Sequence, residues 1–307
     1  MITLVPTFDP KLQNQTKLSE ISDEEFNKGI IPTKSTTKDR IIQVILFILG
    51  FGWLRFLLLI GVTILYAILV IPSVIFHKFP FILNFGINLS RVYFRVAFFL
   101  LGLSWLTFKG KLDPKAKCIL FNHQTVLDGP LIYILKPFTV LGMAELKKAF
   151  LIGNILTANG TVFVDRSKHE GASQKITEYL ESDTQRPMVL APEGKTTKGQ
   201  FLLQFRTGSF IAHAPIQCAT IRYRQFFAYG GAGIVWAVGG FKEWLWRILC
   251  LPMFTVEIEF LPLMDGEEFL KKTPQEKALE CNLLMANKLG VRATNRSSRN
   301  MFKNKKE

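Results

Sequence analysis

The sequence predicts an α/β fold, a mixed β-sheet flanked by helices, preceded by a hydrophobic helix or hairpin that anchors the chain to a membrane. From residue 110 onward, short apolar runs of strand length alternate with stretches of helical length. Residues 41–76 contain only Gln43 and Arg55 as strongly polar side chains. Of the 307 residues, 49% are hydrophobic, which is high for a soluble protein and modest for a polytopic one. Together these observations indicate a globular domain with a limited membrane part.

The composition changes along the chain and divides it into parts. Residues 1–40 are polar with mixed charge, and we expect a flexible tail without a signal peptide, because the first apolar run lies too far from Met1. Residues 41–108 are expected to form membrane-anchoring and interfacial helices, residues 109–292 the folded domain, and residues 293–307 a basic tail.

The chain is strongly basic. Lys and Arg total 38 and Asp and Glu total 24, so the formal net charge is 38 − 24 = +14. Such a charge suits nucleic acid, anionic lipid headgroups or phosphorylated substrates. The 27 phenylalanines and the apolar N-terminal third favour lipid and phosphate, and no nucleic-acid-binding module is recognisable, so no nucleic-acid partner is expected. The four cysteines lack zinc or disulfide spacing, which predicts no metal site.

The apolar run at 41–76 is too long for one upright membrane helix. It would measure about 54 Å at the helical rise, against a hydrocarbon core of about 30 Å. An arginine at mid-bilayer costs about 2.5–3.5 kcal/mol on insertion scales. We therefore expect a span over 56–76 with Arg55 at its end, where the side chain reaches the interface. Residues 41–54 would lie in the interface or form the other arm of a shallow hairpin, and the flanking charge does not choose between these alternatives.

A second apolar stretch covers residues 81–108. Arg91 and Arg95 lie one helical turn apart in it. The pattern fits a helix that lies along the membrane surface and leads into the domain, and a core helix fits nearly as well.

Strands and helices are expected to alternate within the domain. The strand-like runs are 118–121, 160–164, 187–191, 217–223 and 255–261, and the helical stretches are 128–136, 143–156, 170–182, 201–213 and 274–289. The last helix has the clearest ends. Thr273, Pro274 and Glu276 are typical of a capped helix start, and Gly290 is typical of a helix stop.

A histidine and an aspartate lie where the strand at 118–121 gives way to a helix. His123 and Asp128 are five positions apart, a rotation of about 140° on a straight helix. They meet only if His123 lies in the connecting turn and Asp128 near the helix start, which Pro130 supports. A histidine held by an aspartate is the base-and-orienter part of a catalytic triad, and no Ser or Cys nucleophile lies nearby in the sequence. The substrate would then supply the nucleophile; the alternative is a capped helix with a surface histidine.

Two later strands end in segments suited to a phosphate. Residues 160–166 end in the pair Asp165 and Arg166, and the arginine offers a planar donor fork. Residues 191–199 form a turn rich in Gly, Thr and Lys, whose backbone amides, hydroxyls and ammonium groups can surround a phosphate. Glu193 suits this role only if it pairs with Arg166 or holds an acceptor hydroxyl. The alternatives are a surface ion pair in the first segment and a polar loop in the second.

Four short motifs, in this order and spacing, resemble the sequence blocks of the glycerolipid acyltransferase family, which includes the lysophosphatidate acyltransferases. They are His-x4-Asp at 123–128, Gly-x2-Phe-x-Asp-Arg at 160–166, Pro-Glu-Gly at 192–194 and Ala-Pro-Ile at 214–216. Further segments resemble the lysophosphatidylcholine acyltransferases and their lysophosphatidylethanolamine relatives. These segments are 201–210, 256–262 and 288–291, so the resemblance extends over residues 40–292.

The resemblance implies an acyl-CoA-dependent O-acyltransferase of phospholipid synthesis and remodelling, with residues 109–292 as its catalytic domain. His123 would be the general base that takes the proton from the hydroxyl of a lysophospholipid, and Asp128 would orient the imidazole. The hydroxyl oxygen would attack the thioester of acyl-CoA, the co-substrate, without a bound cofactor. The substrate-binding residues would be Asn122, Arg166, Glu193, Gly194, Lys195 and Thr196.

The acceptor and the cellular site are less closely defined. Lysophosphatidylcholine or lysophosphatidylethanolamine is the expected acceptor, and lysophosphatidate, glycerol-3-phosphate and a non-catalytic membrane scaffold are the alternatives. Ala191 and Lys195 replace the usual Phe and Thr of Phe-Pro-Glu-Gly-Thr, and Cys218 stands where a second proline is usual. Lys303 and Lys305 resemble a dilysine retrieval signal, which favours the endoplasmic reticulum membrane with the catalytic domain in the cytosol.

Overall fold

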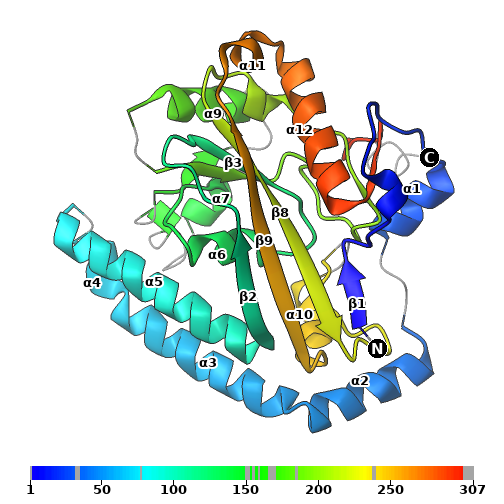
Figure 1. Cartoon of the computed structure of the whole chain (residues 1–307). Helices are drawn as coiled ribbons and strands as arrows, with labels where there is room; N and C mark the ends of the chain where they lie inside the picture. Colours follow the sequence, from blue (N-terminus) through cyan, green and yellow to red (C-terminus); the bar gives the residue numbers. More distant parts are fainter. Residues whose placement is uncertain are drawn as a thin grey trace.

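The computed structural model describes residues 2–31, 35–76, 78–148, 153, 156–157, 160–164, 171–183, 186–236 and 240–299. Helices cover both faces of a mixed β-sheet, and a band of apolar helices runs along one side of the domain (Figure 1). The expected α/β fold with an N-terminal hydrophobic helix or hairpin is therefore confirmed.

The central sheet has the strand order β2-β9-β8-β3-β6, and β1 pairs with β8 outside this path. The strands are β1 (Ile2–Val5), β2 (Leu103–Lys109), β3 (Cys118–Phe121), β6 (Met188–Leu190), β8 (Ile216–Phe226) and β9 (Met253–Met264). β3 runs parallel to β6 and β8, whereas β8 and β9 are antiparallel. The carboxyl ends of β3, β6 and β8 therefore meet at one edge of the sheet, where α/β folds place their ligands.

Two short parallel strand pairs complete the β-structure among the described residues. They are β4 (Leu141–Met143) with β5 (Val162–Val164), and β7 (Phe201–Leu202) with β10 (Arg292–Ala293). Each of the expected strand-like runs overlaps one of the strands β3, β5, β6, β8 and β9.

Alternate residues of β3 enter two hydrophobic cores. Ile119 and Phe121 pack into one core, and Cys118 and Leu120 pack into the other. A strand covered on both faces carries a continuous apolar run, which is why β3 is apolar throughout. The first core is covered by α5 (Pro80–Leu100), α6 (Asp128–Tyr133) and α10 (Phe241–Leu249), and the second by α9 (Gly171–Glu181) and α12 (Pro274–Leu289).

Shorter helices connect these elements. They are α7 (Ala144–Lys147), α11 (Glu267–Lys271) and the 3-10 turns η1 (Pro10–Leu12) and η2 (Thr207–Phe210). Most of the helix expected at 143–156 lies outside the described residues. The ends of α12 are those that the sequence predicted, with a capping box between Thr273 and Glu276 and a left-handed Gly290 at φ 65°.

The helix expected at 201–213 is wrong. This segment forms β7 and η2, with Phe201, Leu202 and Leu203 buried in succession. Its backbone amides are taken by distant acceptors, since Gln204 donates to the Arg296 carbonyl and Arg206 to the Pro192 carbonyl. An amide used in this way cannot form the local hydrogen bond that a helix needs.

Residues 1–40 were expected to form a flexible tail, but the described residues of this segment include ordered elements that pack on the domain. β1 pairs with β8 over four residues, and α1 (Asp23–Ile30) buries Phe26 and Ile30 against β7. Two apolar residues four positions apart on a capped helix are enough to dock it. The tail expected at 293–307 is likewise partly ordered, because Thr294 and Ser298 are buried, and residues 300–307 lie outside the described part.

The N-terminal apolar helices form a hairpin with arms that differ from the expected ones. α2 (Thr37–Leu49) ends at Gly50, and α3 (Gly52–Leu69), α4 (Ile71–Ile75) and α5 follow. α3 packs antiparallel to α5, so the second arm is α5 and not the segment 41–54, whose last residues already belong to α3. The expected span at 56–76 is divided between α3 and α4. Within the described part of the chain, α3 is the one helix long and apolar enough to cross a membrane.

The surface helix expected at 81–108 is divided in two. α5 ends at Leu100, and β2 follows as an edge strand of the sheet. α5 contributes to the first core through Phe98, as the core-helix alternative expected, while Phe81 and Phe99 are exposed.

Arg55 does not extend away from the domain as expected. Its guanidinium donates to the carbonyls of Leu249 at 2.6 Å and Leu251 at 3.1 Å, and it also reaches Pro252. These carbonyls lie at the end of α10 and in the turn to β9. Arg55 therefore attaches the base of α3 to the folded domain.

Candidate active site

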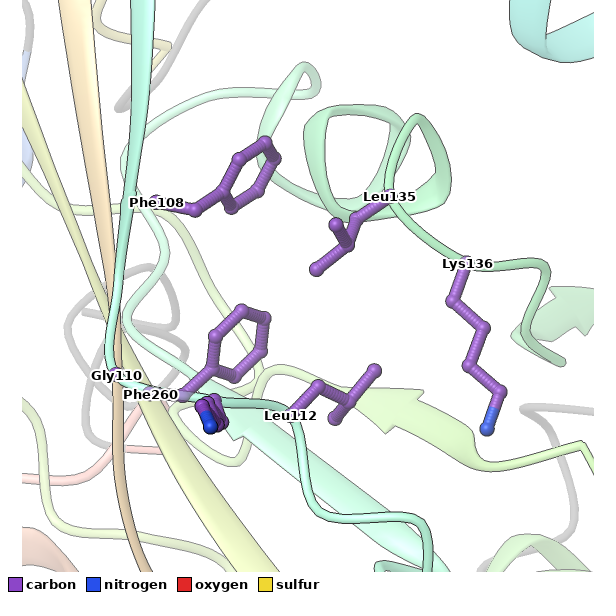
Figure 2. Close-up of a pocket in the computed structure, with 7 residues that line it drawn as sticks. Phe108, Gly110, Leu112, Leu135, Lys136 and Phe260 are labelled. Carbon is purple, nitrogen blue, oxygen red and sulfur yellow. The ribbon is translucent and has the colours of Figure 1, made fainter.

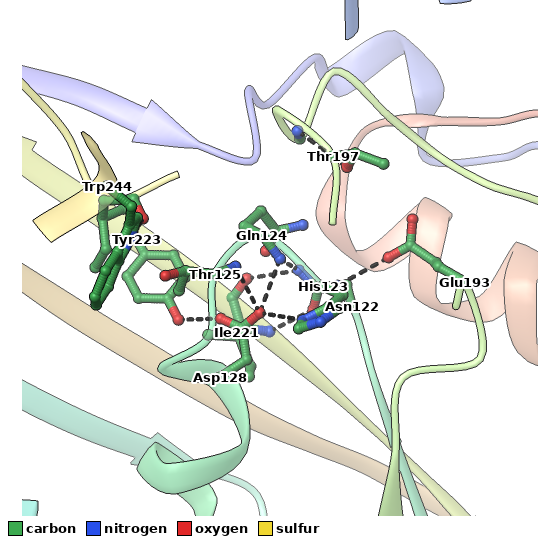
Figure 3. A network of polar contacts seen from close by, with 12 residues as sticks. Asn122, His123, Gln124, Thr125, Asp128, Glu193, Thr197, Ile221, Tyr223 and Trp244 are labelled. Atoms are coloured by element: carbon green, nitrogen blue, oxygen red, sulfur yellow. Dashed lines mark hydrogen bonds and ion pairs between the residues drawn. The ribbon is translucent and has the colours of Figure 1, made fainter. Parts of the chain in front are cut away.

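The histidine and aspartate that the sequence singled out lie in contact. His123 lies in the turn after β3, and Asp128 is the first residue of α6. His123 Nδ1 and Asp128 Oδ2 are 2.8 Å apart, so Nδ1–H donates to the carboxylate (Figure 3). Among the described residues, His123 Nε2 has no hydrogen-bond partner, and the side chain is 25% exposed. The basic nitrogen can therefore meet a substrate.

Asp128 is fully buried, and its charge is compensated by hydrogen-bond donors. Oδ2 also accepts from the backbone amides of Gln124 at 2.8 Å and Thr125 at 2.9 Å. Oδ1 accepts from the hydroxyl of Tyr223 on β8. A buried carboxylate requires such partners, because transfer from water without them is costly. The aspartate is therefore fixed as an acceptor that holds the imidazole in one orientation.

Glu193 links the His123 turn to a second loop. Its Oε1 accepts from the His123 amide at 2.8 Å and its Oε2 from the Leu203 amide at 3.0 Å. The side chain is fully buried, and this burial raises the pKa of Glu193 to about 8. Both carboxylate oxygens are used internally, so this structure does not present Glu193 to a phosphate as the sequence suggested.

The side chain of Asn122 also makes its hydrogen bonds within the protein. Its Nδ2 donates to the Ile221 carbonyl at 2.9 Å, and its Oδ1 accepts from the Ile221 amide at 2.7 Å. The side chain is fully buried and continues the pairing of β3 with β8 beyond the last backbone pair. It faces the protein interior, whereas the sequence suggested a substrate contact.

The turn after β6 lies beside His123. The Thr197 amide donates to the His123 carbonyl at 3.0 Å, which fixes the two loops against each other. Gly194 is exposed with φ 68°, a conformation that favours glycine, and Lys195 is half-buried. Thr196 is buried, at 8% exposure. The structure thus brings Gly194 and Lys195 to the same edge of the sheet as His123.

Arg166, the other expected phosphate ligand, lies outside the described residues, as does Asp165. β5, the strand that precedes them, ends at Val164 and pairs with β4 outside the main sheet.

Two buried polar atoms beside the histidine have no partner among the described residues. They are Gln124 Nε2 and Thr125 Oγ1. Buried donors in this state usually bind an ordered water or a ligand. The described residues contain no group of three or more His, Cys, Asp or Glu side chains that could hold a metal ion.

An apolar cavity of about 440 Å³ opens elsewhere on the domain. Phe108, Leu112, Leu135 and Phe260 point toward its centre, and Lys136 extends along its rim (Figure 2). Leu135 follows the end of α6 that is remote from Asp128. The cavity is therefore separate from the His123 turn.

Tyr223 is the residue of this site that the sequence analysis missed. It lies 95 positions from Asp128, and no local motif marks it. The available signal was a tyrosine at the end of the strand-like run expected at 217–223, which becomes informative only when that strand is known to lie beside β3.

Comparisons with known proteins agree with the family resemblance. Residues 109–223 match the family model described as Acyltransferase. The chain is 27% identical over 208 residues to the lysophospholipid acyltransferase LPCAT4 of Xenopus tropicalis, covering 65% of this chain and 39% of the relative. It is 31% identical over 160 residues to human lysophosphatidylcholine acyltransferase 1, covering 51% of this chain and 30% of the relative. The chain thus spans well under half the length of these relatives.

Two further likenesses support the same family and the fold. The lysophospholipid acyltransferase LPEAT2 of Arabidopsis thaliana is 26% identical over 224 residues, covering 68% of this chain and 39% of the relative. Among solved structures, the 1-acyl-sn-glycerophosphate (LPA) acyltransferase PlsC of Thermotoga maritima superposes with a TM-score of 0.57 at 16% identity. The superposition covers 81% of this chain and 96% of that structure, which establishes a common fold.

Proposed function

We propose that this member of the acyltransferase family is a membrane-bound, acyl-CoA-dependent O-acyltransferase that esterifies the free hydroxyl of a lysophospholipid. The observation that carries the proposal is the His123–Asp128 pair, in which Nδ1 is held by a buried carboxylate and Nε2 has no partner among the described residues. The relatives with lysophospholipid acyltransferase in their names support this acceptor class.

In the proposed reaction, His123 Nε2 accepts the proton of the acceptor hydroxyl while its oxygen attacks the thioester carbonyl carbon. A carbon–oxygen bond forms, the carbon–sulfur bond breaks, and the proton passes from the imidazolium to the departing thiolate. Asp128 keeps the Nδ1–H tautomer and stabilises the transient imidazolium. The products are the diacyl lipid and free coenzyme A, and no acyl-enzyme is formed.

The neighbouring residues divide into two roles in this proposal. Gly194, Lys195 and Thr196 would surround the phosphate of the acceptor, because their turn is fixed beside His123. Arg166 stays a proposed phosphate ligand on sequence grounds alone. Asn122 and Glu193 would position the base, since their buried side chains hold the strand and turn that carry it.

The membrane contact would be the outer face of the hairpin. Tyr66 of α3 hydrogen-bonds Ser90 of α5 at 2.9 Å, and the adjacent Arg91 donates to the Ile134 carbonyl of the domain. The half of α3 that contains Tyr66 therefore lies at the same height as the part of the domain that carries Arg91 and Lys136. If α3 stood upright across a bilayer, this part would enter hydrocarbon, where unpaired charge is costly. We therefore favour a hairpin that lies along one leaflet, with the endoplasmic reticulum as the proposed membrane.

The test is acyl transfer by the purified chain in detergent or vesicles. Labelled acyl-CoA is offered with lysophosphatidylcholine, lysophosphatidylethanolamine, lysophosphatidate or glycerol-3-phosphate. We expect transfer to one or both of the first two, and His123→Ala should reduce it by about 10²–10⁴-fold, the usual contribution of a general base. His213→Ala is the matched control, because His213 is an exposed histidine outside the site.

The scaffold alternative makes a different prediction in the same assay. Saturable binding of acyl-CoA without transfer to any acceptor would support a non-catalytic role. Full activity of the His123→Ala variant would reject the assigned base.

A further inference from the structure

The hydroxyl of Tyr223 points toward the carboxylate of Asp128 (Figure 3). Tyr223 lies on β8, has 0% exposure, and donates to Asp128 Oδ1. Its phenol stays protonated, because burial and the charge of Asp128 raise its pKa well above the ordinary value. The hydroxyl is therefore a permanent donor to the carboxylate.

The two oxygens of Asp128 differ in what they contact. Oδ2 accepts from His123 Nδ1 and from two backbone amides. Among the described residues, Tyr223 is the sole donor to Oδ1. Removal of this hydroxyl would leave half of a buried carboxylate without a partner, and a hydrogen bond to a charged group contributes more than one between neutral groups.

We propose that Tyr223 is a positioning residue that shares the charge of Asp128 and thereby sets how strongly the His123 imidazole holds a proton. The inference rests on the proposed function. A carboxylate that has lost a donor attracts the imidazolium more strongly, so His123 would hold its proton to higher pH. A base that is already protonated cannot accept the proton of the acceptor hydroxyl.

The surroundings of the hydroxyl contain few other groups that titrate. Asp128 and His123 belong to the segment between β3 and α6, and Glu193 from the loop after β6 interacts with the Asp128 charge. On the opposite side, β9 contributes the apolar ring of Phe254, 6.4 Å from the Tyr223 ring. The effect of Tyr223 on the titration midpoint of His123 can therefore be separated from the effect of Glu193 by comparing variants of the two residues.

Tyr223→Phe is the direct test, because it removes the hydroxyl and retains the ring. The full chain in detergent is labelled with ¹⁵N-histidine, and the His123 resonance, identified by its loss in His123→Ala, is titrated by NMR. We expect the midpoint to move to higher pH by about one unit, the equivalent of one charge-assisted hydrogen bond. The acid limb of kcat/KM should move by the same amount, with near-normal turnover at high pH.

A matched control is Tyr179→Phe. Tyr179 also donates a hydrogen bond, to the Arg186 carbonyl at 2.9 Å; it is half-buried and lies on α9. The Tyr179→Phe variant should leave the titration midpoint of His123 unchanged. This result would separate a specific effect on the His123–Asp128 pair from general destabilisation.

Replacement of Tyr223 by 3-fluorotyrosine gives an opposite test that keeps the hydrogen bond. The more acidic phenol is a stronger donor, so the His123 midpoint should move to lower pH. This variant also serves if Tyr223→Phe does not fold. An unchanged midpoint in a folded variant overturns the role of Tyr223, whether or not the enzyme acylates lysophospholipid. A shifted midpoint without acyl transfer by the wild-type chain overturns the proposed function and leaves the role of Tyr223 in place.

Discussion

Glu193 Oε1 accepts a 2.8 Å hydrogen bond from the backbone amide of His123, so a buried carboxyl holds the turn that carries the candidate base. Burial raises the pKa of Glu193 to about 8. The folded chain therefore retains a proton that the unfolded chain releases near the ordinary pKa of glutamate. Folding stability linked to this group is complete at low pH and is lost as the pH rises through the folded pKa.

Glu193→Gln tests this linkage. In the wild-type chain, the free energy of unfolding should fall as pH rises from about 4.5 to 8, because the folded state binds more protons over this window. The glutamine variant cannot ionise, so its stability should vary less with pH, although its amide fits the Leu203 N–H less well. Denaturant unfolding across the pH series measures both slopes. Parallel slopes for the two proteins would contradict the prediction.

Asn122→Ala should destabilise the domain. The change leaves the amide and the carbonyl of Ile221 without their buried partner. Each unsatisfied buried group costs about 1–3 kcal/mol, so we expect a loss of about 2–4 kcal/mol in the free energy of unfolding. Asn14→Ala, at an exposed position, is the control. A loss similar to that of the control would show that the pairing of Asn122 with Ile221 does not stabilise the domain.

Arg55→Met should loosen the attachment of α3 to the domain. The guanidinium donates to the Leu249 and Leu251 carbonyls, and charged hydrogen bonds contribute about 1.5–3 kcal/mol each. We expect faster amide hydrogen exchange over residues 248–254. Arg95→Met is a milder control, because Arg95 donates one long bond of 3.4 Å to Ile134. Unchanged exchange would restore the expectation that Arg55 reaches the membrane interface.

Local signals predicted the parts of the fold that depend on neighbouring residues. The capped start of α12 needs only Thr273 and Glu276, and the meeting of His123 with Asp128 needs only one turn between a strand and a helix. The site residues that depend on distant pairing could not be predicted. Tyr223 reaches Asp128 only because β8 lies beside β3, and the helix expected at 201–213 fails because Glu193 and other distant groups take its amides.

The position of Arg55 and the docking of α1 also depend on residues that are distant in the sequence and could not be predicted from it. Arg55 contacts carbonyls 194 or more positions away, so an arginine at the edge of an apolar run was assigned to the interface by composition alone. Two apolar residues, Phe26 and Ile30, are too weak a sequence pattern to predict that α1 docks on the domain. They pack against Phe201 and Leu203, which are distant in the sequence.

The hairpin makes a topological prediction through Lys78, an exposed residue between α4 and α5. The four native cysteines are buried, so an impermeant maleimide will report on a single introduced thiol. In sealed vesicles with the catalytic domain outside, Lys78→Cys should react from outside, as should the control Lys38→Cys, at an exposed position in the first turn of α2. This follows because Arg91 ties α5 to the domain at Ile134, which prevents α3 from standing upright in the bilayer. Reaction at position 78 only after the vesicle lumen is opened would show that the hairpin crosses the membrane.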